Sequence, residues 1–353
     1  MKRVLKIVAI VLAAIILVAG GYFAYVMIAY HRLGSGPITP EGVAEGADGK
    51  EEYSIVTYNI GFGAYEPDYG FFMDGGSESW AWSEERLDAN MKKIASFLKE
   101  RDADFYVIQE VDIDSTRTYH VDERKYLTDV FGGMSRTFAQ NYDSPFLFYP
   151  IINPHGSSKS GLVTLSKYEI KSAERVELPI ETGFTKFLDL DRCYSKNRIT
   201  TDKGHDLVLY DFHLSAYTSD GTIATEQLKL LLDDIEEEYK AGNYCVAGGD
   251  FNKDILGDSS KYFGKSDKEY TWAQPIPEGT LDKYDVTLVA PVDEENPVPT
   301  TRNADGPYHK GQYVVMIDGF LVSANVEVTS ASVIDTEFAY SDHNPVTMTF
   351  KLK

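Results

Sequence analysis

The chain has 353 residues, 43% of them hydrophobic and 13% aromatic, enough to bury a large core in one big domain or two small ones. Its formal net charge at pH 7 is −21, and because residues 1–32 carry four basic side chains and no acid, the remainder carries −25. That charge disfavours tight, non-specific binding of nucleic acid through a basic patch, but it does not exclude a nuclease, because bound divalent cations reverse the sign locally.

Residues 1–32 predict a cytoplasmic tail and a membrane anchor. No charged residue occurs from Ile7 to Tyr30, a stretch of 24 residues. A helix needs about 20 residues to cross a bilayer, whereas the apolar core of a signal peptide has roughly 7–15. Lys2, Arg3 and Lys6 precede the stretch, so we expect a cytoplasmic N-terminus and an extracytoplasmic remainder. A cleaved signal is the alternative, and it would export the same domain.

Beyond the anchor, we expect a tether and one domain. Residues 33–52 are rich in Gly, Glu and Pro, which is typical of a flexible tether. No linker or repeat divides residues 53–353, which therefore form a single domain. Of the two cysteines, Cys245 alternates inward in an apolar strand and is predicted to be a buried thiol. The sequence leaves a disulfide with Cys193 open.

The domain begins with a strand, a loop and a helix. The strand Tyr53–Asn59 ends on an amide, and an aromatic-rich loop, Gly61–Trp82, follows it. This loop either packs on the domain itself or borders a cleft and stacks on a substrate. Ser83 is a predicted N-cap, and the helix after it has an apolar stripe at helical spacing. The stripe consists of Leu87, Met91, Ile94 and Leu98.

Further strands and a second helix follow in the middle of the chain. The run 105–110 is a buried strand that ends on Glu110, and 207–214 is an alternating strand that delivers His213. Two more strands are expected at 161–167 and 197–200. A second helix has the stripe Leu228, Leu231, Leu232, Ile235 and Tyr239, with Asp233, Glu236 and Glu237 opposite. Hairpin-like strands with sparse helices favour two packed sheets with helices outside, a four-layered α/β sandwich.

The C-terminal third places polar groups beside apolar strands. The run 248–252 reads Gly-Gly-Asp-Phe-Asn, and 340–345 reads Tyr-Ser-Asp-His-Asn-Pro. Between them, 314–323 predicts a strand that contains Asp318. Strand ends can hold carboxylates, an amide and an imidazole rigidly against a cleft. Such groups suit metal-assisted attack of water on phosphorus, because oxygen ligands favour a hard cation such as Mg²⁺.

These segments, in this order from Tyr53 to Lys353, resemble the endonuclease/exonuclease/phosphatase superfamily. That group includes deoxyribonuclease I, apurinic endonucleases, inositol polyphosphate 5-phosphatases and bacterial sphingomyelinases. Each motif alone is short, but six segments in order, each with its polar residue at or inside a predicted strand, make a specific combination. The resemblance implies the same four-layered sandwich. It also implies a site that binds Mg²⁺ or Mn²⁺ through Glu110, with Asn59 and Asp342 close to the metal.

The resemblance further implies roles for five other side chains. Asp250 would align or deprotonate the attacking water, and Asn252 would hydrogen-bond the phosphate. His343 would contact the scissile phosphate while Asp318 orients its imidazole, and His213 would stabilise charge on the phosphoryl oxygens. A strand-end turn or a satisfied core histidine is the structural alternative for each.

Parts of the family pattern have no clear match. Lys159, Lys196 and Arg198 are candidates for additional positive charge at the site. Tyr142 and Asn153 are candidates for the family's phosphate-contacting residue in the middle of the chain. A Glu partner for His213, known in deoxyribonuclease-like members, has no evident counterpart.

The sequence thus predicts a membrane-tethered, metal-dependent phosphoesterase. A nuclease is the first substrate expectation, and a phospholipid or inositol-phosphate phosphodiesterase or phosphatase is the second. A non-catalytic binding domain on the same fold is the alternative from another class, and the presence of Glu110, Asp250 and His343 argues against it. No obligate protein partner is indicated, and the membrane is contacted through the N-terminal helix.

Overall fold

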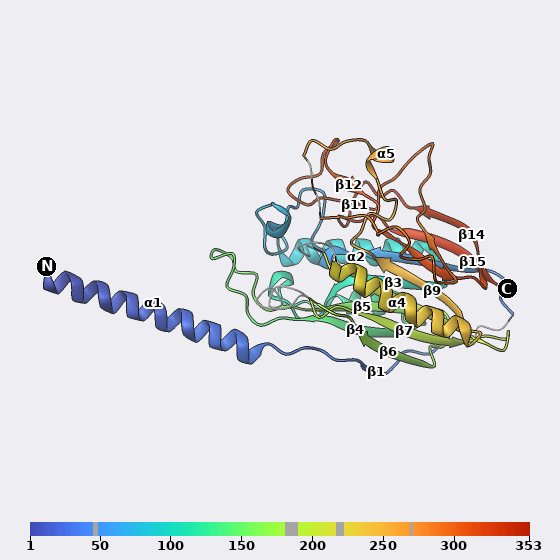
Figure 1. Cartoon of the computed structure of the whole chain (residues 1–353), viewed down its shortest axis with the longest axis horizontal. Coiled ribbons are helices and arrows are strands. Elements are labelled where there is room, and N and C mark those ends of the chain that lie inside the picture. Colours follow the sequence, from blue (N-terminus) through green and yellow to red (C-terminus); the bar gives the residue numbers. More distant parts are fainter. Residues whose placement is uncertain (45–48, 181–189, 217–221, 269, 271) are drawn as a thin grey trace.

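A long N-terminal helix projects from a body of β-sheets and helices (Figure 1). The computed structural model describes residues 1–44, 49–180, 190–216, 222–268, 270 and 272–353. The projecting helix, α1 (Lys2–Ala29), is long and apolar enough to cross a bilayer by length and composition, a test that a signal sequence also passes. Among its residues only Val26 is buried.

The body contains two mixed sheets. The first consists of β1 (Gly36–Ile38), β6 (Ser172–Glu177), β7 (Cys193–Thr200), β8 (Asp206–His213), β9 (Tyr244–Asp250), β13 (Asp318–Ser323) and β10 (Val286–Val289), in that spatial order. The second consists of β14 (Val326–Val333), β15 (Val346–Leu352), β2 (Tyr53–Asn59), β3 (Phe105–Asp112), β5 (Lys159–Ser166) and β4 (Ser135–Asp143). Each sheet holds one parallel pair, β8 with β9 and β2 with β3, among antiparallel ones. A separate ribbon joins β11 (Thr301–Arg302) to β12 (Val314–Val315).

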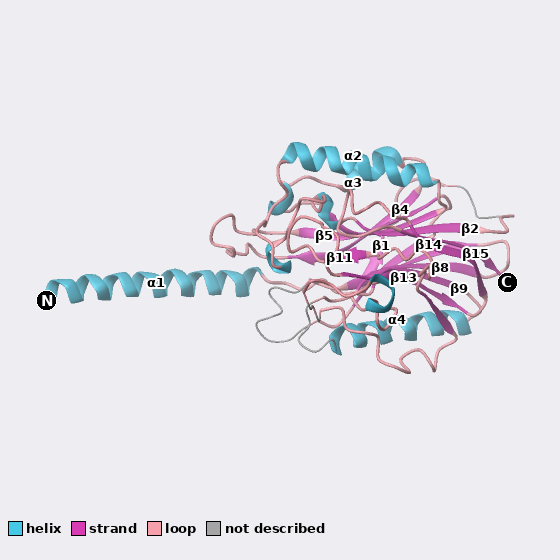
Figure 2. Cartoon of the chain, turned by 90° about the horizontal axis from the view of Figure 1, so that it is seen from above, coloured by secondary structure: helices cyan, strands magenta, loops and turns pink. Residues whose placement is uncertain are grey.

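Helices cover the outer faces of the two sheets (Figure 2). On one side α2 (Glu84–Arg101) and α3 (Arg124–Val130) pack on the second sheet, and on the other α4 (Thr222–Lys240) packs on the first. A short α5 (Ser260–Phe263) and 3-10 turns at Gly61–Gly63, Phe72–Asp74 and Thr116–Thr118 lie in the connections. The predicted four-layered sandwich is therefore confirmed.

Both long helices form for the reasons that their sequences indicate. The Ser83 hydroxyl accepts a hydrogen bond from the Arg86 N–H at 3.2 Å and caps α2. Its four stripe residues are buried against the second sheet, and the leucines and Ile235 of the α4 stripe are buried against the first. Glu236, expected on the exposed face of α4, is instead buried, because its carboxylate accepts the Asp285 N–H at 2.8 Å.

The space between the sheets changes from apolar to polar along its length. Side chains alternate across a strand, so Ile55, Thr57 and Asn59 of β2 share the inner face, while Val56 and Tyr58 face the α2 side. The inner core includes Ile55, Phe105, Val107, Leu207, Leu209, Val246, Phe320 and Met348. The next inward positions are polar: Asn59, Gln109, Asp211, His213, Asp250 and Asp318. One end of the inter-sheet space thus becomes a polar site on rigid strands.

Two segments differ from expectation. The run 314–323 is not one strand, because β12 pairs with β11 while β13 pairs with β9. At the break the Thr300 hydroxyl accepts the N–H groups of Ile317 (2.8 Å) and Asp318 (3.1 Å), and Asp318 therefore begins β13 rather than lying within a strand.

The expected tether, residues 33–52, is attached to the body in part. Its residues 36–38 form β1 and pair with β6 at the sheet edge, and the Arg175 guanidinium donates to the carbonyls of Leu33 and Gly34 at 2.8 and 2.9 Å. Residues 45–48 of this segment lie outside the described residues. The two cysteines, Cys193 and Cys245, are both buried and free, so no disulfide joins them.

The close approach of β8 and β9 requires Gly249. A Cβ there would overlap the backbone carbonyl oxygen of Phe212 in β8, next to His213. We expect Gly249→Ala to lower the free energy of unfolding by about 1–3 kcal/mol, as overpacking does elsewhere. Gly133→Ala is the control, because a Cβ at Gly133 meets no atom within 4 Å. Urea denaturation of both variants measures this, and equal stability would contradict the packing argument.

Candidate active site

Three neighbouring strands of the first sheet place His213, Asp250 and Asp318 side by side. In the register of the sheet, His213 at the end of β8 is opposite Asp250 at the end of β9, which is opposite Asp318 at the start of β13. All three side chains are buried. The His213 Nε2 atom lies 3.5 Å from Asp250 Oδ2 and 3.8 Å from Glu110 Oε1. Burial and the nearby Arg192 cation lower the pKa of His213 well below its ordinary value, so this imidazole is neutral.

The loop before β15 brings the second histidine to the same place. The Asp342 carbonyl accepts the Arg302 N–H and the Thr301 hydroxyl, each at 3.0 Å, which fixes the loop against the β11–β12 ribbon. His343 Nδ1 is 2.9 Å from Asp318 Oδ2, and its Nε2 is 3.8 Å from Asp250 Oδ2. Burial opposes the charged form, yet the carboxylates of Asp318 and Asp342 raise the pKa of His343 well above its ordinary value.

Asn59 connects the two sheets. Its Nδ2 donates to Glu110 Oε1 at 3.0 Å and to Asp250 Oδ2 at 3.1 Å, while its Oδ1 accepts the Gly61 N–H at 3.0 Å. Asp250 is also held by the Asn252 N–H, 2.7 Å from its Oδ1. The Asn252 side chain donates to the Leu214 carbonyl at 2.8 Å. The amide of Asn59 thus sets the position of one carboxylate from each sheet.

Glu110 reaches the cavity through an irregularity of β3. The pairing of β3 with β5 shifts register between Ile108 and Val111, and Glu110 has a positive φ of 57°. Bulges with a residue in this left-handed region re-aim a side chain and often occur beside functional sites. Burial and the Asp342 carboxylate raise the pKa of Glu110 above its ordinary value. Burial likewise raises the pKa of Asp342, although His343 and Arg302 oppose the shift, so two buried acids repel each other here.

The donor set around Glu110 fits a hard divalent cation. It offers carboxylate oxygens of Glu110 and Asp342, which Mg²⁺ and Mn²⁺ prefer, while Asn59 lies beside them with its Nδ2 on Glu110 and its Oδ1 on the Gly61 N–H. Gly61 leaves room for it, since its φ is +53° and a Cβ there would lie 2.9 Å from Asp342 Oδ1. A second group, Asp250, Asp318 and His343, places ligand atoms within 4.8 Å of one another, but hydrogen bonds to Asn59, Asn252 and within the group already engage several of them.

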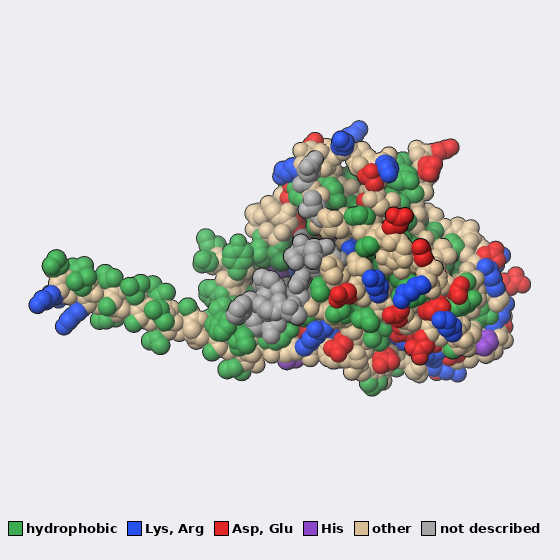
Figure 3. Space-filling view, viewed as in Figure 1, with side chains coloured by type: hydrophobic (Ala, Val, Ile, Leu, Met, Phe, Trp, Pro, Cys, Tyr) green, Lys and Arg blue, Asp and Glu red, His purple; other side chains and the backbone are tan. Residues whose placement is uncertain are grey.

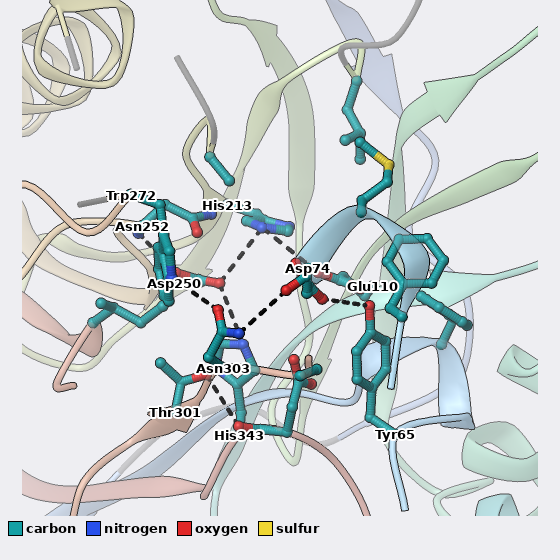
Figure 4. A pocket seen from close by; sticks show the side chains of 18 of the residues that line it. Tyr65, Asp74, Glu110, His213, Asp250, Asn252, Trp272, Thr301, Asn303 and His343 are labelled. Carbon is teal, nitrogen blue, oxygen red and sulfur yellow. Dashed lines mark hydrogen bonds and ion pairs between the residues drawn. The ribbon is translucent and has the colours of Figure 1, made fainter. Parts of the chain in front are cut away.

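Most of these groups line one cavity of about 300 Å³, with Asn59 and Asp318 behind its lining (Figure 4). Glu110, His213, Asp250, Asn252 and His343 converge on it from different elements, and Asp342 also lines it. Trp272 lies beside Asn252, and Tyr65 lies across the cavity from it. The expected aromatic loop packs on the domain itself, and part of it also borders the cavity. Its Phe62, Tyr65 and Phe71 are buried in the domain's own core cluster, and the same three side chains border the cavity.

Three arginines that line the cavity were not anticipated: Arg117, Arg192 and Arg302. The Arg117 guanidinium forms two 2.9 Å bonds to Asp112 and lies 3.7 Å from the Phe62 ring centroid. Arg302 is held by backbone carbonyls, including those of Gly306 and Glu66. Arg192 directly precedes β7, whereas the strand expected from sequence began only at residue 197, so its place at a strand start was missed.

The lysines and arginine expected to supply charge lie elsewhere. Lys196 pairs with Asp234 and Glu238 of α4 at 2.6 Å each, and Arg198 pairs with Glu238 at 2.7 Å. Their side chains point to the outer face of the first sheet because they occupy even positions in β7, opposite to the inward Asn197. Lys159 lies 4.0 Å from Asp114 and is exposed.

Of the two candidates for the phosphate-contacting residue, Tyr142 and Asn153, only Tyr142 lines the cavity. Tyr142 lines the cavity and is buried, which raises its pKa. Asn153 lies in the loop after β4, where its backbone carbonyl accepts the Ser79 hydroxyl at 2.5 Å. Among the described residues, no Glu pairs with the Nδ1 atom of His213, which has no hydrogen-bond partner there. The nearest acid to this imidazole is Asp250, on the Nε2 side.

Comparison with known proteins identifies the family of this chain. Residues 56–343 match the model of the Endonuclease/Exonuclease/phosphatase family. The fold is similar to that of the endonuclease/exonuclease/phosphatase from Beutenbergia cavernae DSM 12333, with 18% identity, a TM-score of 0.58, and coverage of 86% of this chain and 72% of that one. No curated protein sequence matches the chain.

The solved structures of ANGEL2 and TDP2 are also similar in fold. ANGEL2, a 2',3'-cyclic phosphatase solved with adenosine-2',3'-vanadate, has 16% identity, a TM-score of 0.57, and coverage of 89% of this chain and 98% of its own. Truncated TDP2 from Caenorhabditis elegans has 15% identity, a TM-score of 0.51, and coverage of 85% and 97%. Because the family match extends over most of the residues from β2 to His343, the chain belongs to the endonuclease/exonuclease/phosphatase family and is a phosphoric ester hydrolase.

Proposed function

We propose that this protein is a phosphoesterase that depends on Mg²⁺ or Mn²⁺ and cleaves a P–O bond by in-line attack of water. The observation that carries the proposal is the meeting of two groups of side chains across the inter-sheet space. Glu110, Asn59 and Asp342 come from the second sheet and its connections, and His213, Asp250 and Asp318 come from the first.

Glu110 and Asp342 would hold the cation, and Asn59 beside them would orient Glu110 through its Nδ2. A bound divalent ion polarises a phosphoryl oxygen and neutralises charge that develops in the transition state. Burial raises the pKa of both Glu110 and Asp342 despite the nearby Arg117, Arg302 and His343, so a bound cation would further stabilise the two carboxylates as anions. A cation is the partner that this arrangement favours.

Asp250 would orient the attacking water and accept its proton. Its carboxylate is buried, and it is fixed by the Asn59 amide and the Asn252 N–H, so it is preorganised for this task. The side chain of Asn252 borders the cavity and would donate to the phosphate.

The two histidines differ in protonation, which gives them different tasks. His343, kept protonated by Asp318 and Asp342, would donate from Nε2 to a phosphoryl oxygen that gains charge. His213, kept neutral by burial, would donate a single hydrogen bond from whichever ring nitrogen carries its proton. Asp318 is a positioning residue, because it touches the far nitrogen of His343.

The proposal includes the membrane location. We propose that α1 is retained as a single span with its N-terminus in the cytoplasm, since Lys2, Arg3 and Lys6 precede its uncharged stretch. The catalytic domain then lies on the extracytoplasmic side. A non-catalytic binding domain is disfavoured, because such a domain has no need for a buried acid pair, a base and two differently charged imidazoles in one cavity.

Glu110→Gln tests the metal site. The substitution is nearly isosteric, and because burial already disfavours the carboxylate, we expect thermal stability without metal to be equal or higher. The Mn²⁺ concentration for half-maximal activity should rise at least about tenfold, the scale of lost metal-site contacts. Stabilisation of the fold by added Mn²⁺, seen as a rise in Tm, should shrink in parallel.

The matched control is Glu100→Gln on α2, whose side chain is 71% exposed and far from the cavity. It should leave both the metal dependence and the Mn²⁺-induced rise in Tm unchanged. Wild-type activity of Glu110→Gln at limiting Mn²⁺ would refute the assignment of Glu110 as a ligand.

A double-mutant cycle tests the pairing of Asp318 with His343. Asp318→Asn should lower kcat by about 10- to 100-fold, because it removes the carboxylate that holds and charges the imidazole. Combined with His343→Ala it should lose little more than His343→Ala alone, since residues that act as a unit are not additive. Steady-state kinetics of the three variants decide the matter. Multiplicative losses would mean that Asp318 acts independently of His343.

A further inference from the structure

An exposed apolar loop projects from the body beside α1. It comprises residues 146–152 between β4 and β5, reads Phe-Leu-Phe-Tyr-Pro-Ile-Ile, and contains no charged residue. Phe148 is 56% exposed, Tyr149 69%, Ile151 80% and Ile152 83%. Figure 3 shows hydrophobic side chains gathered on this protrusion and along α1, at one end of an otherwise mixed and charged surface. Contiguous exposed apolar side chains of this kind mark an interaction surface.

The loop touches the last turns of α1. The Tyr22 hydroxyl donates to the Phe146 carbonyl at 3.1 Å and accepts the Phe148 N–H at 3.0 Å, and the Tyr25 hydroxyl accepts the Phe146 N–H at 3.0 Å. The rings of Tyr22 and Phe148 lie edge to face with centroids 6.2 Å apart. These contacts fix the position of the loop along the axis of α1.

With α1 as a membrane span, this position along the helix corresponds to the outer boundary of the membrane. Counting the roughly 20 residues that cross a bilayer from Ile7, directly after Lys6, the span ends near Val26. Tyr22 and Tyr25 then occupy its final turn or two, where tyrosines are enriched at the membrane–water interface. The loop contacts both tyrosines and lies at the same depth.

The body is held in this position by the chain that follows α1. His31 Nε2 lies 3.1 Å from Asp143 Oδ2 at the end of β4, Arg32 donates to the Leu178 carbonyl, and β1 pairs with β6. With this segment attached, the domain remains next to the end of the helix.

The loop is also continuous with the wall of the cavity. The His155 N–H donates to the Tyr149 carbonyl at 3.1 Å, and the Phe72 ring lies 5.8 Å from the rings of both Tyr149 and His155. His155 lines the cavity. A surface that rests on residues 148–152 thus lies beside the wall of the site.

We infer that residues 148–152 are a second membrane contact, seated in the outer leaflet beside α1, and that the cavity receives a phosphate ester carried by a lipid of that bilayer. The inference rests on the proposed function and on α1 as a span. The occupant is a bilayer because the loop continues the apolar surface of α1. Attraction to anionic lipid cannot drive the contact, because the chain after residue 32 carries −25, so insertion of apolar side chains does.

A depth probe tests the contact in the full-length protein. Ile152→Cys carries an NBD label, and the chain is reconstituted in phosphatidylcholine vesicles with or without doxyl-labelled lipid. The native thiols do not interfere, because Cys193 and Cys245 are buried and burial raises the pKa of each to about 12. We expect a blue-shifted emission at position 152 that doxyl lipid quenches at least about twofold.

The control label is placed at Glu327→Cys, on exposed β14 at the end of the domain opposite α1 (Figure 1), where no quenching is expected. Equal, weak quenching at both positions would overturn the inference. So would a blue shift at position 152 that follows protein concentration rather than doxyl lipid, since it would mark contact between two copies of the chain.

A pair of substrates tests the consequence for catalysis. Methyl 4-methylumbelliferyl phosphate is soluble, and hexadecyl 4-methylumbelliferyl phosphate carries the same reacting group in the vesicle. The variant Ile151→Asp/Ile152→Asp should lower kcat/KM for the hexadecyl ester at least about tenfold and leave that for the methyl ester unchanged. Leu230→Asp, on the exposed part of α4, should change neither.

The outcomes separate the inference from the proposed function. Hydrolysis of the methyl ester with equal effects of the loop variant on both substrates would overturn the lipid inference and leave the phosphoesterase standing. Absence of hydrolysis of either ester by the wild type with Mg²⁺ or Mn²⁺ would count against the proposed function, and the doxyl quenching would then still decide the membrane contact.

Discussion

The site depends on the distance between the two sheets at the point where their strands end, and the Asn59 amide spans that distance. One side-chain nitrogen donates to Glu110 of its own sheet and to Asp250 of the other. A hydrogen bond of this kind loses strength steeply with length, so a change of 1 Å in sheet spacing would break it. The apolar layer from Ile55 to Met348 sets this spacing, and the geometry of the site is therefore a consequence of core packing.

The two-residue alternation of side chains along a strand explains why the polar residues meet. Alternation across a strand puts Asn59, Gln109, Asp211 and Asp250 on inner faces, and the strand register brings their ends to one edge. Gln109 donates to Asp211 across the sheets at 2.7 Å, one layer below the site. Burial of Asp211 raises its pKa well above its ordinary value, so this layer is polar but poor in charge. The acids and imidazoles of the candidate site lie at the strand ends beyond this layer, most of them lining the cavity.

Much of this could be predicted from sequence, because it follows from local periodicity. The strand that ends at Asn59, the two helix stripes and the order of polar motifs are local patterns, and the family resemblance assigned them to one site. The strand break at Met316 and Ile317 was not predictable, since its cause is the Thr300 hydroxyl, which is distant in sequence. Lys196 and Arg198 were misplaced because their alternation directs them to acids of α4, which only the packing of that helix reveals. The positive φ of Glu110 likewise arises from a shift in pairing with β5.

The segment after α1 shows that composition alone can mislead about how freely a domain moves relative to the helix before it. Gly and Pro in residues 33–52 are typical of a flexible linker, yet β1 pairs with β6 and Arg175 binds the carbonyls of Leu33 and Gly34. These backbone contacts are independent of what Gly and Pro favour in an isolated chain, because they are supplied by the sheet edge. A long free tether would let the domain sample substrates far from the membrane. The attached segment instead holds the body beside the end of α1, so, with α1 as the proposed span, sheet pairing rather than linker length would set where the cavity lies relative to the membrane.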